Sequence, residues 1–263
     1  MKASAARSFF INPIVAKFKK PVATDLSQID VVILCGGLGT RLRSEIGDSQ
    51  KVMAPIGEIP FLDIIIDDLK EEGFRHIVLA TGYKSESIIL HYKKENQNRW
   101  GNLEIKYSEE DSPLGTGGAI YNARLFLKSN PFIVLNGDSF CPISYRSFID
   151  FHKSRGGLAT LVVSRVANVK DYGSVNFNTH SYLVNSFEEK VNQQSGYANA
   201  GIYCFDQKVF LPSMFYKPSS LEKHILPMIM NRKSLHAFEV DAEFIDIGTP
   251  ERYLKAQKML KNK

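Results

Sequence analysis

From Ile29 onward, short apolar runs of β-type residues alternate with segments in which apolar residues recur at helical spacing. The run 29–35 is rich in β-branched residues and leads directly into glycines, as a buried strand of a parallel sheet does. Between 61 and 69, apolar residues recur every three or four positions while acids occupy the other face, which predicts an amphipathic helix. This alternation favours an α/β protein with a single domain: a mostly parallel mixed sheet with helices on both faces.

The same pattern predicts the other elements. Strands are expected at 76–81, 103–108, 132–135, 158–164, 173–177, 182–187, 201–205 and 235–240, and helices at 85–94 and 118–127. Ligands of such sheets bind beyond the carboxyl ends of strands, so we expect a site in the segments after Cys35, Ser108 and Leu135. No repeat of 20–50 residues is visible, so neither a solenoid nor a β-helix is expected.

Composition excludes several classes of protein. The longest apolar runs are far shorter than a membrane span. The three cysteines stand far apart without metal-type spacing, so we expect no disulfide scaffold or zinc module, and a reducing cytoplasm is the predicted location. The net charge of +5 comes without any block of basic residues, which does not favour nucleic acid. Neither nucleic acid nor a membrane is therefore an expected partner, whereas anionic small molecules are compatible with this charge.

Residues 1–28 are predicted to form an N-terminal extension, and residues 29–263 the single domain. Residues 1–24 carry five basic residues and no acid, and Pro13 and Lys17 interrupt their apolar stretch, so the h-region of a secretory signal is missing. We expect a flexible or peripherally packed extension. An organelle transit peptide stays open as an alternative, because Ala, Ser and Arg occur there without acids.

A glycine-rich loop, Gly36-Gly37-Leu38-Gly39-Thr40-Arg41, follows the first strand directly. Its glycines let the backbone approach an anion closely, and Arg41 adds a fork of donors suited to phosphate oxygens. Leu42 stands where a dinucleotide-binding fingerprint needs its last glycine, which argues against a dinucleotide-dependent oxidoreductase. No Gly-Lys-Ser/Thr closes a Walker A loop either. On these residues alone, a tight turn and a phosphate site remain equal alternatives.

Further motifs follow this loop in order. Lys51 and Pro55 come first, and then 114–119 (LGTGGA), 136–138 (NGD), 189–190 (EK), 199–203 (NAGIY) and 244–250 (FIDIGTP). Together with the loop, they resemble the signature of the sugar nucleotidyltransferases, the nucleotide-sugar pyrophosphorylases, over about 29–253. The resemblance implies a Rossmann-like fold of the nucleotide-diphospho-sugar transferase type. It also implies a reaction in which a sugar 1-phosphate attacks the α-phosphorus of a nucleoside triphosphate and pyrophosphate leaves.

The resemblance further implies a role for each matching residue. The catalytic residues would be Arg41, Lys51 and Asp138, and the carboxylates of Asp138 and Asp246 would hold Mg²⁺. The nucleotide would contact Leu34, Gly36, Gly37, Gly39, Thr40, Arg41, Gly115, Thr116 and Gly117. The sugar phosphate would contact Glu189, Lys190, Asn199, Gly201 and Glu222. The implied partners are a nucleoside triphosphate and a sugar 1-phosphate, and a homo-oligomer is compatible with the resemblance.

Within the family, segments 34–37 (LCGG), 53–56 (MAPI), 60–62 (PFL) and 114–119 are most similar to the D-glycero-D-manno-heptose 1-phosphate guanylyltransferases. GTP and a heptose 1-phosphate are therefore the expected substrates. Mannose 1-phosphate with GTP, or a hexose 1-phosphate with UTP or dTTP, are the alternatives. The chain departs from the family around Lys51, which lies between Gln50 and Val52 where family members have prolines on both sides.

Each acidic candidate also has an alternative interpretation. Asp138 follows Asn-Gly and fits a turn, and Asp246 could end a strand ahead of a helix capped by Thr249. We interpret the acidic cluster 109–111 as a solvated loop rather than a second metal site. For the whole protein, the alternative is a catalytically idle homologue that only binds a nucleotide sugar, although all candidate catalytic and metal residues are present.

Overall fold

The computed structural model describes residues 24–37, 39–82, 85–95, 99–167, 169, 172, 174–188, 195–212 and 218–260. Most of the predicted extension and two predicted sugar-phosphate residues, Glu189 and Lys190, lie outside this part of the chain. Within it, every helix is too short or too polar to cross a membrane.

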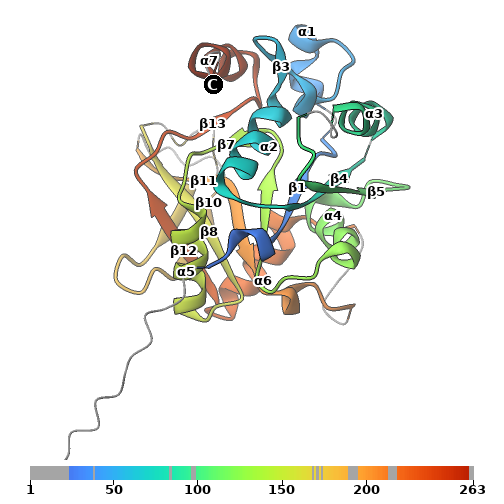
Figure 1. The fold of residues 1–263 in the computed structure, drawn as a ribbon. Helices are drawn as coiled ribbons and strands as arrows, with labels where there is room; N and C mark the ends of the chain where they lie inside the picture. The colour runs from blue at the N-terminus through green and yellow to red at the C-terminus, as the bar shows by residue number, and fades with distance from the viewer. Residues whose placement is uncertain are drawn as a thin grey trace, which may run out of the picture.

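Among the described residues, nine strands form a mixed central sheet (Figure 1). Its main path runs β10-β9-β11-β6-β1-β4-β5, and β8 pairs with β11 and β12. Neighbours are parallel from β6 through β1 and β4 to β5, whereas β11 runs antiparallel to β6 and β8. The expected mixed sheet is confirmed, and its antiparallel pairs belong to the second half of the chain. The strands are β1 (Asp30–Leu34), β4 (His76–Thr81), β5 (Glu104–Glu109), β6 (Phe132–Asn136), β8 (Ala159–Val166), β9 (Ser174–Phe177), β10 (Val184–Glu188), β11 (Gly196–Phe205) and β12 (Leu235–Val240).

Helices cover both faces of this sheet, as expected. Successive residues of a strand point to opposite faces, and in β1 Val31 and Ile33 join one buried cluster while Val32 joins the other. The first cluster includes residues of α2, α3, α5 and α7, and the second includes residues of α4 and α6. The helices are α1 (Arg43–Ile46), α2 (Phe61–Glu72), α3 (Ser85–Glu95), α4 (Gly115–Ala123), α5 (Tyr145–Arg155), α6 (Leu226–Asn231) and α7 (Pro250–Leu260), and a π-helical turn, η7 (Leu221–Ile225), precedes α6.

Some elements differ from the expected ones. The helix expected at 118–127 begins earlier as α4, so the glycines of the 114–119 motif lie inside it, and it passes into the 3-10 turn η4 (Arg124–Phe126). The strand expected at 201–205 is the second half of β11, whose pairing with β8 changes register between Asn199 and Tyr203. α5 has no counterpart among the expected helices.

Two small sheets lie between the main elements. β7 (Ser139–Phe140) pairs antiparallel with β13 (Ile245–Asp246), which joins the segment after β6 to the segment before α7. β2 (Pro55–Ile56) and β3 (Ile59–Pro60) form a second pair directly after the 3-10 turn η3 (Lys51–Met53). α7, β3 and α1 lie at the same end of the molecule (Figure 1).

The first described residues pack on α5. The Thr24 hydroxyl donates to the Asp150 carboxylate at 2.6 Å, and the Arg146 guanidinium donates to the Thr24 carbonyl. Leu26, in the 3-10 turn η1 (Leu26–Gln28), is only 2% exposed and belongs to the first buried cluster. The last residues of the predicted extension therefore contribute to the core.

Candidate active site

The fold brings together two chain segments that are far apart in the sequence and that each carry an acid. Asp138 follows β6 after a tight Gly137 turn, and Asp246 lies in β13 directly opposite Ser139 of β7. The backbone N–H of Ile247 donates to the Asp138 carbonyl at 3.1 Å, which fixes the two segments side by side.

The two oxygens of Asp246 have different surroundings. Oδ1 accepts hydrogen bonds from the Gly248 backbone N–H and from Arg252 Nη1, each at 2.8 Å. Oδ2 is buried and has no hydrogen-bond partner among the described residues. An orphaned buried carboxylate oxygen is costly, and a cation would satisfy it.

Lys51 connects the Asp138 carboxylate to the glycine loop. Its ammonium forms an ion pair with Asp138 Oδ2, and its side chain is 12% exposed against 34% for Asp138. Gly39 packs on this lysine: it has a left-handed φ of +58°, and a Cβ there would lie 3.1 Å from the Lys51 Cβ. Position 39 therefore requires glycine for two reasons, its left-handed backbone and its close contact with Lys51. This contact helps to position Lys51.

The first two glycines of the loop are open to solvent. Gly36 and Gly37 are exposed, and a Cβ on Gly37 would meet no atom within 4 Å. Arg41, in the 3-10 turn η2 (Thr40–Leu42), is also exposed. The loop therefore presents free backbone and a guanidinium at the carboxyl end of β1, as a phosphate-binding loop does.

Several predicted residues line one cavity of about 160 Å³. Its lining includes Gly37 from the loop, the Lys51–Asp138 pair and Glu222 from η7. The described residues that line it are Leu34, Gly37, Lys51, Val52, Thr116, Asn136, Asp138 and Glu222. The predicted residues Gly36, Gly39, Arg41, Gly115, Gly117, Asn199, Gly201 and Asp246 are not part of this lining.

The glycines of the 114–119 motif are used mainly for packing. Gly115 has a φ of +74°, and a Cβ there would lie 2.5 Å from the Ser219 carbonyl oxygen. That carbonyl accepts hydrogen bonds from the N–H groups of Gly117 and Gly118. The hydroxyl of Thr116, which lies between Gly115 and Gly117, donates to Glu222 at 3.0 Å. The motif therefore docks α4 onto the segment that carries Glu222, and this contact positions Thr116 at the cavity.

Asn199 and Gly201 lie at the irregular centre of β11. Gly201 has a φ of +73°, its N–H donates to Asn199 Oδ1 at 3.0 Å, and a Cβ on it would lie 2.8 Å from Asn136 Nδ2. The Asn199 amide donates to the buried Tyr203 hydroxyl. The irregularity in β11 thus places Gly201, with its bond to the Asn199 side chain, beside Asn136, the residue of β6 that lines the cavity.

Glu110 is a candidate that the sequence pattern did not single out. It was interpreted with its neighbours as part of a solvated loop, and for Glu110 this is wrong, whereas Glu109 and Asp111 are exposed. Glu110 is half-buried beside Gly36 and Gly82 and accepts a hydrogen bond from the Leu114 N–H at 3.1 Å. Burial raises the pKa of its carboxyl, and the hydrogen bond opposes this shift. Its place directly after β5, at the carboxyl end of a parallel strand, was the available signal.

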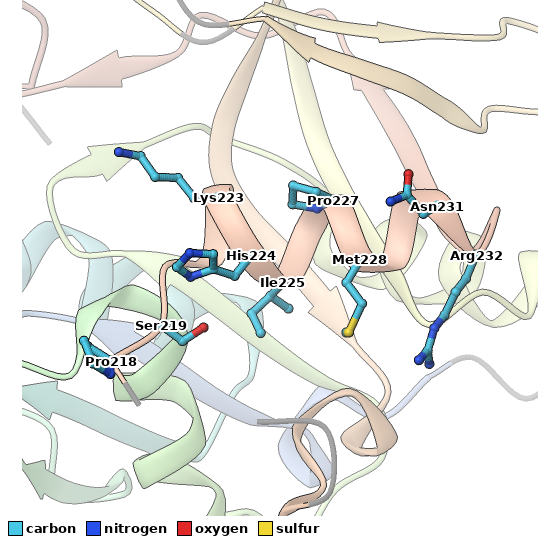
Figure 2. A pocket seen from close by; sticks show the side chains of 9 residues that line it. All are labelled: Pro218, Ser219, Lys223, His224, Ile225, Pro227, Met228, Asn231 and Arg232. Carbon is cyan, nitrogen blue, oxygen red and sulfur yellow. The ribbon is translucent and has the colours of Figure 1, made fainter. Parts of the chain in front are cut away.

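A larger cavity of about 790 Å³ lies along η7 and α6. Figure 2 shows Ile225 and Met228 from these turns, with Pro218 and Ser219 on the neighbouring segment. The described lining of this cavity contains no carboxylate and none of the predicted residues. The smaller cavity at the strand ends is therefore the candidate active site, despite its size.

A mixed α/β sheet whose strand ends carry a glycine loop, a lysine and two carboxylates has the features of an enzyme that handles phosphorylated nucleotides. The family model described as Nucleotidyl transferase matches residues 30–263, and the chain therefore belongs to this enzyme family. The expected family and fold class are confirmed, while the roles assigned to single residues remain predictions.

Similar proteins include two bacterial guanylyltransferases. D-glycero-alpha-D-manno-heptose 1-phosphate guanylyltransferase of Campylobacter jejuni is 40% identical over 86% of this chain and 97% of that protein. The protein of the same name from Aneurinibacillus thermoaerophilus is 36% identical over 89% of this chain and 99% of its own length. A mannose-1-phosphate guanyltransferase of Schizosaccharomyces pombe is 35% identical over 85% of this chain, which spans 62% of that longer protein.

Solved structures agree with this fold. HddC from Yersinia pseudotuberculosis complexed with GMP-PN superposes with a TM-score of 0.77 at 38% identity, over 88% of this chain and 99% of that one. A putative glucose-1-phosphate thymidylyltransferase from Bacillus anthracis has the same TM-score at 22% identity, covering 89% of this chain and 96% of that one, which supports the fold alone.

Proposed function

We propose that this protein transfers a guanylyl group from GTP to D-glycero-α-D-manno-heptose 1-phosphate, giving a GDP-heptose and pyrophosphate. The similarity to two heptose 1-phosphate guanylyltransferases over nearly their full length supports the substrate pair. The observation that carries the reaction type is the Lys51–Asp138 ion pair at a cavity beside the open glycine loop, with the orphaned Asp246 oxygen next to it.

The reaction asks the protein for charge neutralisation and alignment. A phosphate monoester is ionised near neutral pH, so no side chain has to remove a proton from the attacking oxygen. The free backbone of Gly36 and Gly37 and the exposed Arg41 would hold the triphosphate, and Lys51 would stabilise the negative charge that develops in the transition state. Gly39 would hold the lysine in place through its close contact.

We propose Asp138 and Asp246 as the carboxylates that hold Mg²⁺. The buried Asp246 Oδ2 without a partner and the neighbouring Asp138 carboxylate fit such an ion. No group of three metal-ligating side chains occurs within the described chain. Two carboxylates suit Mg²⁺, which takes few protein ligands and completes its shell with water and substrate phosphates. When bound, it would neutralise charge on the reacting phosphates.

We propose Glu110 as the residue that selects guanine. An ionised carboxylate only accepts hydrogen bonds, and guanine offers two adjacent donors, N1–H and its N2 amino group. Uracil and thymine offer a single N–H between two carbonyl oxygens, which a carboxylate repels. Glu110 lies beside Gly36 and Gly82 at the ends of β1 and β4, where a Cβ on Gly82 would lie 3.3 Å from the Gly36 Cα, so the two glycines let these strand ends approach each other next to the carboxylate.

The sugar phosphate is assigned to the other side of the cavity. Asn199 and Gly201 beside Asn136, together with Glu222, would bind the sugar. Glu189 and Lys190 remain candidates for the hydroxyls and the phosphate of the sugar, on the family resemblance alone.

The test is pyrophosphate release with Mg²⁺ across GTP, UTP, dTTP, CTP and ATP, each with heptose, mannose and glucose 1-phosphates. We expect release with GTP and the manno-configured heptose phosphate. The second candidate is mannose 1-phosphate guanylyltransferase, favoured by the similarity to the Schizosaccharomyces pombe protein, and mannose-specific release would select it. Folded protein that binds GTP but releases no pyrophosphate with any pair would contradict an enzymatic role and favour the idle homologue.

A further inference from the structure

The first helix turn after Asp246 supplies one of its two hydrogen-bond donors. Arg252 lies in the first turn of α7 and donates from Nη1 to Asp246 Oδ1 at 2.8 Å. Its side chain is 19% exposed, and that of Asp246 is 9% exposed. The guanidinium also lies over the Tyr172 ring, 4.4 Å from its centroid, so two neighbours define its position.

This contact gives the two oxygens of the carboxylate different surroundings. Among the described residues, Arg252 Nη1 and the Gly248 N–H both donate to Oδ1, and no group donates to Oδ2. A carboxylate tied down through one oxygen cannot rotate freely about its Cβ–Cγ bond. The free oxygen is thereby held in one direction.

The space beside this carboxylate has to stay free of side chains. A Cβ on Gly248 would lie 2.7 Å from Asp246 Oδ1, 3.5 Å from Arg252 Nη1 and 3.7 Å from Lys51 Nζ. Two cations therefore border the same small volume as Asp246. Lys51 faces it from the glycine-loop side, and Arg252 faces it from α7.

The same helix is fixed to the segment that follows Lys51. The Tyr253 hydroxyl donates to the Pro55 carbonyl at 2.6 Å, and the Gln257 amide donates to the same carbonyl at 2.8 Å. Gln257 also accepts from the Gly57 N–H. α7 thus contacts both Asp246 and the hairpin that follows Lys51.

We propose that Arg252 is a positioning residue that orients Asp246 for the cation, an inference that rests on the proposed function. Two effects oppose each other here. The positive charge of Arg252 repels a cation, while its hydrogen bond fixes the ligand oxygen. The guanidinium donates to Oδ1 and not to the free oxygen, Oδ2. Removing a hydrogen-bond partner of a metal ligand typically lowers metal affinity 10–100-fold. We therefore expect the orienting effect to outweigh the repulsion.

Arg252→Met and Arg252→Lys test this inference, and Lys255→Met is the matched control. Lys255 lies on the same helix and pairs with Glu243 at 2.6 Å on the exposed surface, away from Asp246. Binding of Mn²⁺, a paramagnetic substitute for Mg²⁺, is titrated by electron paramagnetic resonance in the presence of a non-hydrolysable GTP analogue. Affinity for the analogue itself is measured separately in chelator without metal.

We expect Arg252→Met to weaken Mn²⁺ binding about tenfold or more. Arg252→Lys should recover part of this loss, and Lys255→Met should bind like wild type. Affinity for the analogue in chelator should stay unchanged in all three variants. Unchanged or tighter Mn²⁺ binding by folded Arg252→Met would overturn the inference.

This outcome is distinct from failure of the proposed function. If wild-type protein releases no pyrophosphate and binds no Mn²⁺ with the analogue, the proposed function fails. If wild-type protein is active and binds Mn²⁺, but both Arg252 variants match it, only the positioning role fails. Arg252→Lys keeps the charge and most of the side-chain volume, so it reports even if the methionine variant does not fold.

Discussion

Single residues decide whether the proposed site can assemble, and Gly137 is the clearest case. Its N–H donates to the Leu34 carbonyl at 3.0 Å, and a Cβ there would lie 2.7 Å from that carbonyl oxygen. It would also lie 3.0 Å from a methyl group of Val52. The glycine of the Asn-Gly-Asp motif therefore allows three segments of the site to meet. Asp138 follows this turn, so the turn interpretation of Asp138 and its predicted metal role are compatible.

Asp246→Asn should lower turnover on the order of 10²-fold or more, because a neutral amide lacks the negative charge with which the carboxylate would hold the cation. The free energy of unfolding should change little, since the shape of the side chain is kept. Steady-state pyrophosphate release and chemical denaturation measure the two effects. Near-normal turnover with Mg²⁺ would contradict the metal role of Asp246.

Glu110→Gln should lower kcat/KM for GTP by roughly 5–150-fold, because one good bidentate base contact accounts for about 1–3 kcal/mol. The loss with UTP should be smaller, because glutamine can also donate to a carbonyl oxygen of the base. Glu109→Gln is the control, since Glu109 precedes it in sequence and is exposed. Equal losses for GTP and UTP, or an equal effect of the control, would contradict base selection by Glu110.

At the scale of the elements, the first half of the sheet could be predicted because its strands are short, apolar and followed by glycines or acids. The pairing of β7 with β13 could not be predicted, since two residues in each strand leave no pattern in the sequence. The same pairing brings Asp138 and Asp246 together, and only the family resemblance indicated this. The packing of Gly115 on Ser219 was also missed, because glycines at a backbone contact and at a phosphate look alike in sequence.

His152 of α5 makes the stability of the fold depend on pH. Its Nδ1 lies 2.9 Å from the Thr160 hydroxyl of β8, and burial lowers its pKa to about 4. The unfolded chain, with an ordinary histidine pKa near 6.5, therefore binds the additional proton between these values. The free energy of unfolding should consequently rise by up to about 3 kcal/mol as the pH rises from 4 to 7.

Denaturation of His152→Gln at each pH should show a flatter dependence, because glutamine keeps a polar group for Thr160 but does not titrate. His180→Gln is the control, since His180 is exposed. If His152→Gln leaves the slope of the free energy of unfolding against pH unchanged, other groups cause the pH dependence. One of them is the buried His236, whose pKa burial also lowers.

At the scale of the whole molecule, the two buried clusters hold the sheet between its helices while the site lies at the ends of its strands. The core and the site therefore share few side chains, so changes at the proposed site should act mainly on activity. The domain bounds of 29–263 remain a prediction, and Leu26, which precedes them, also belongs to the core.

Removing residues 1–23 should leave activity and stability unchanged, because their composition predicts a flexible or peripherally packed extension. Removing residues 1–28 should lower the free energy of unfolding by about 2–3 kcal/mol, since the buried Leu26 side chain is lost. Thermal unfolding and pyrophosphate release of both variants test this. A large loss of activity on removing 1–23 alone would show that these residues support the fold or an oligomer.

The most direct test of the central claim is formation of GDP-heptose from GTP and D-glycero-α-D-manno-heptose 1-phosphate with Mg²⁺. Wild-type protein and Asp246→Asn are compared at equal folded concentration, with the product followed by chromatography. We expect equal amounts of GDP-heptose and pyrophosphate from wild-type protein, and on the order of 10²-fold less from the variant. Absence of GDP-heptose with wild-type protein, or equal rates for both proteins, would contradict guanylyl transfer at this site.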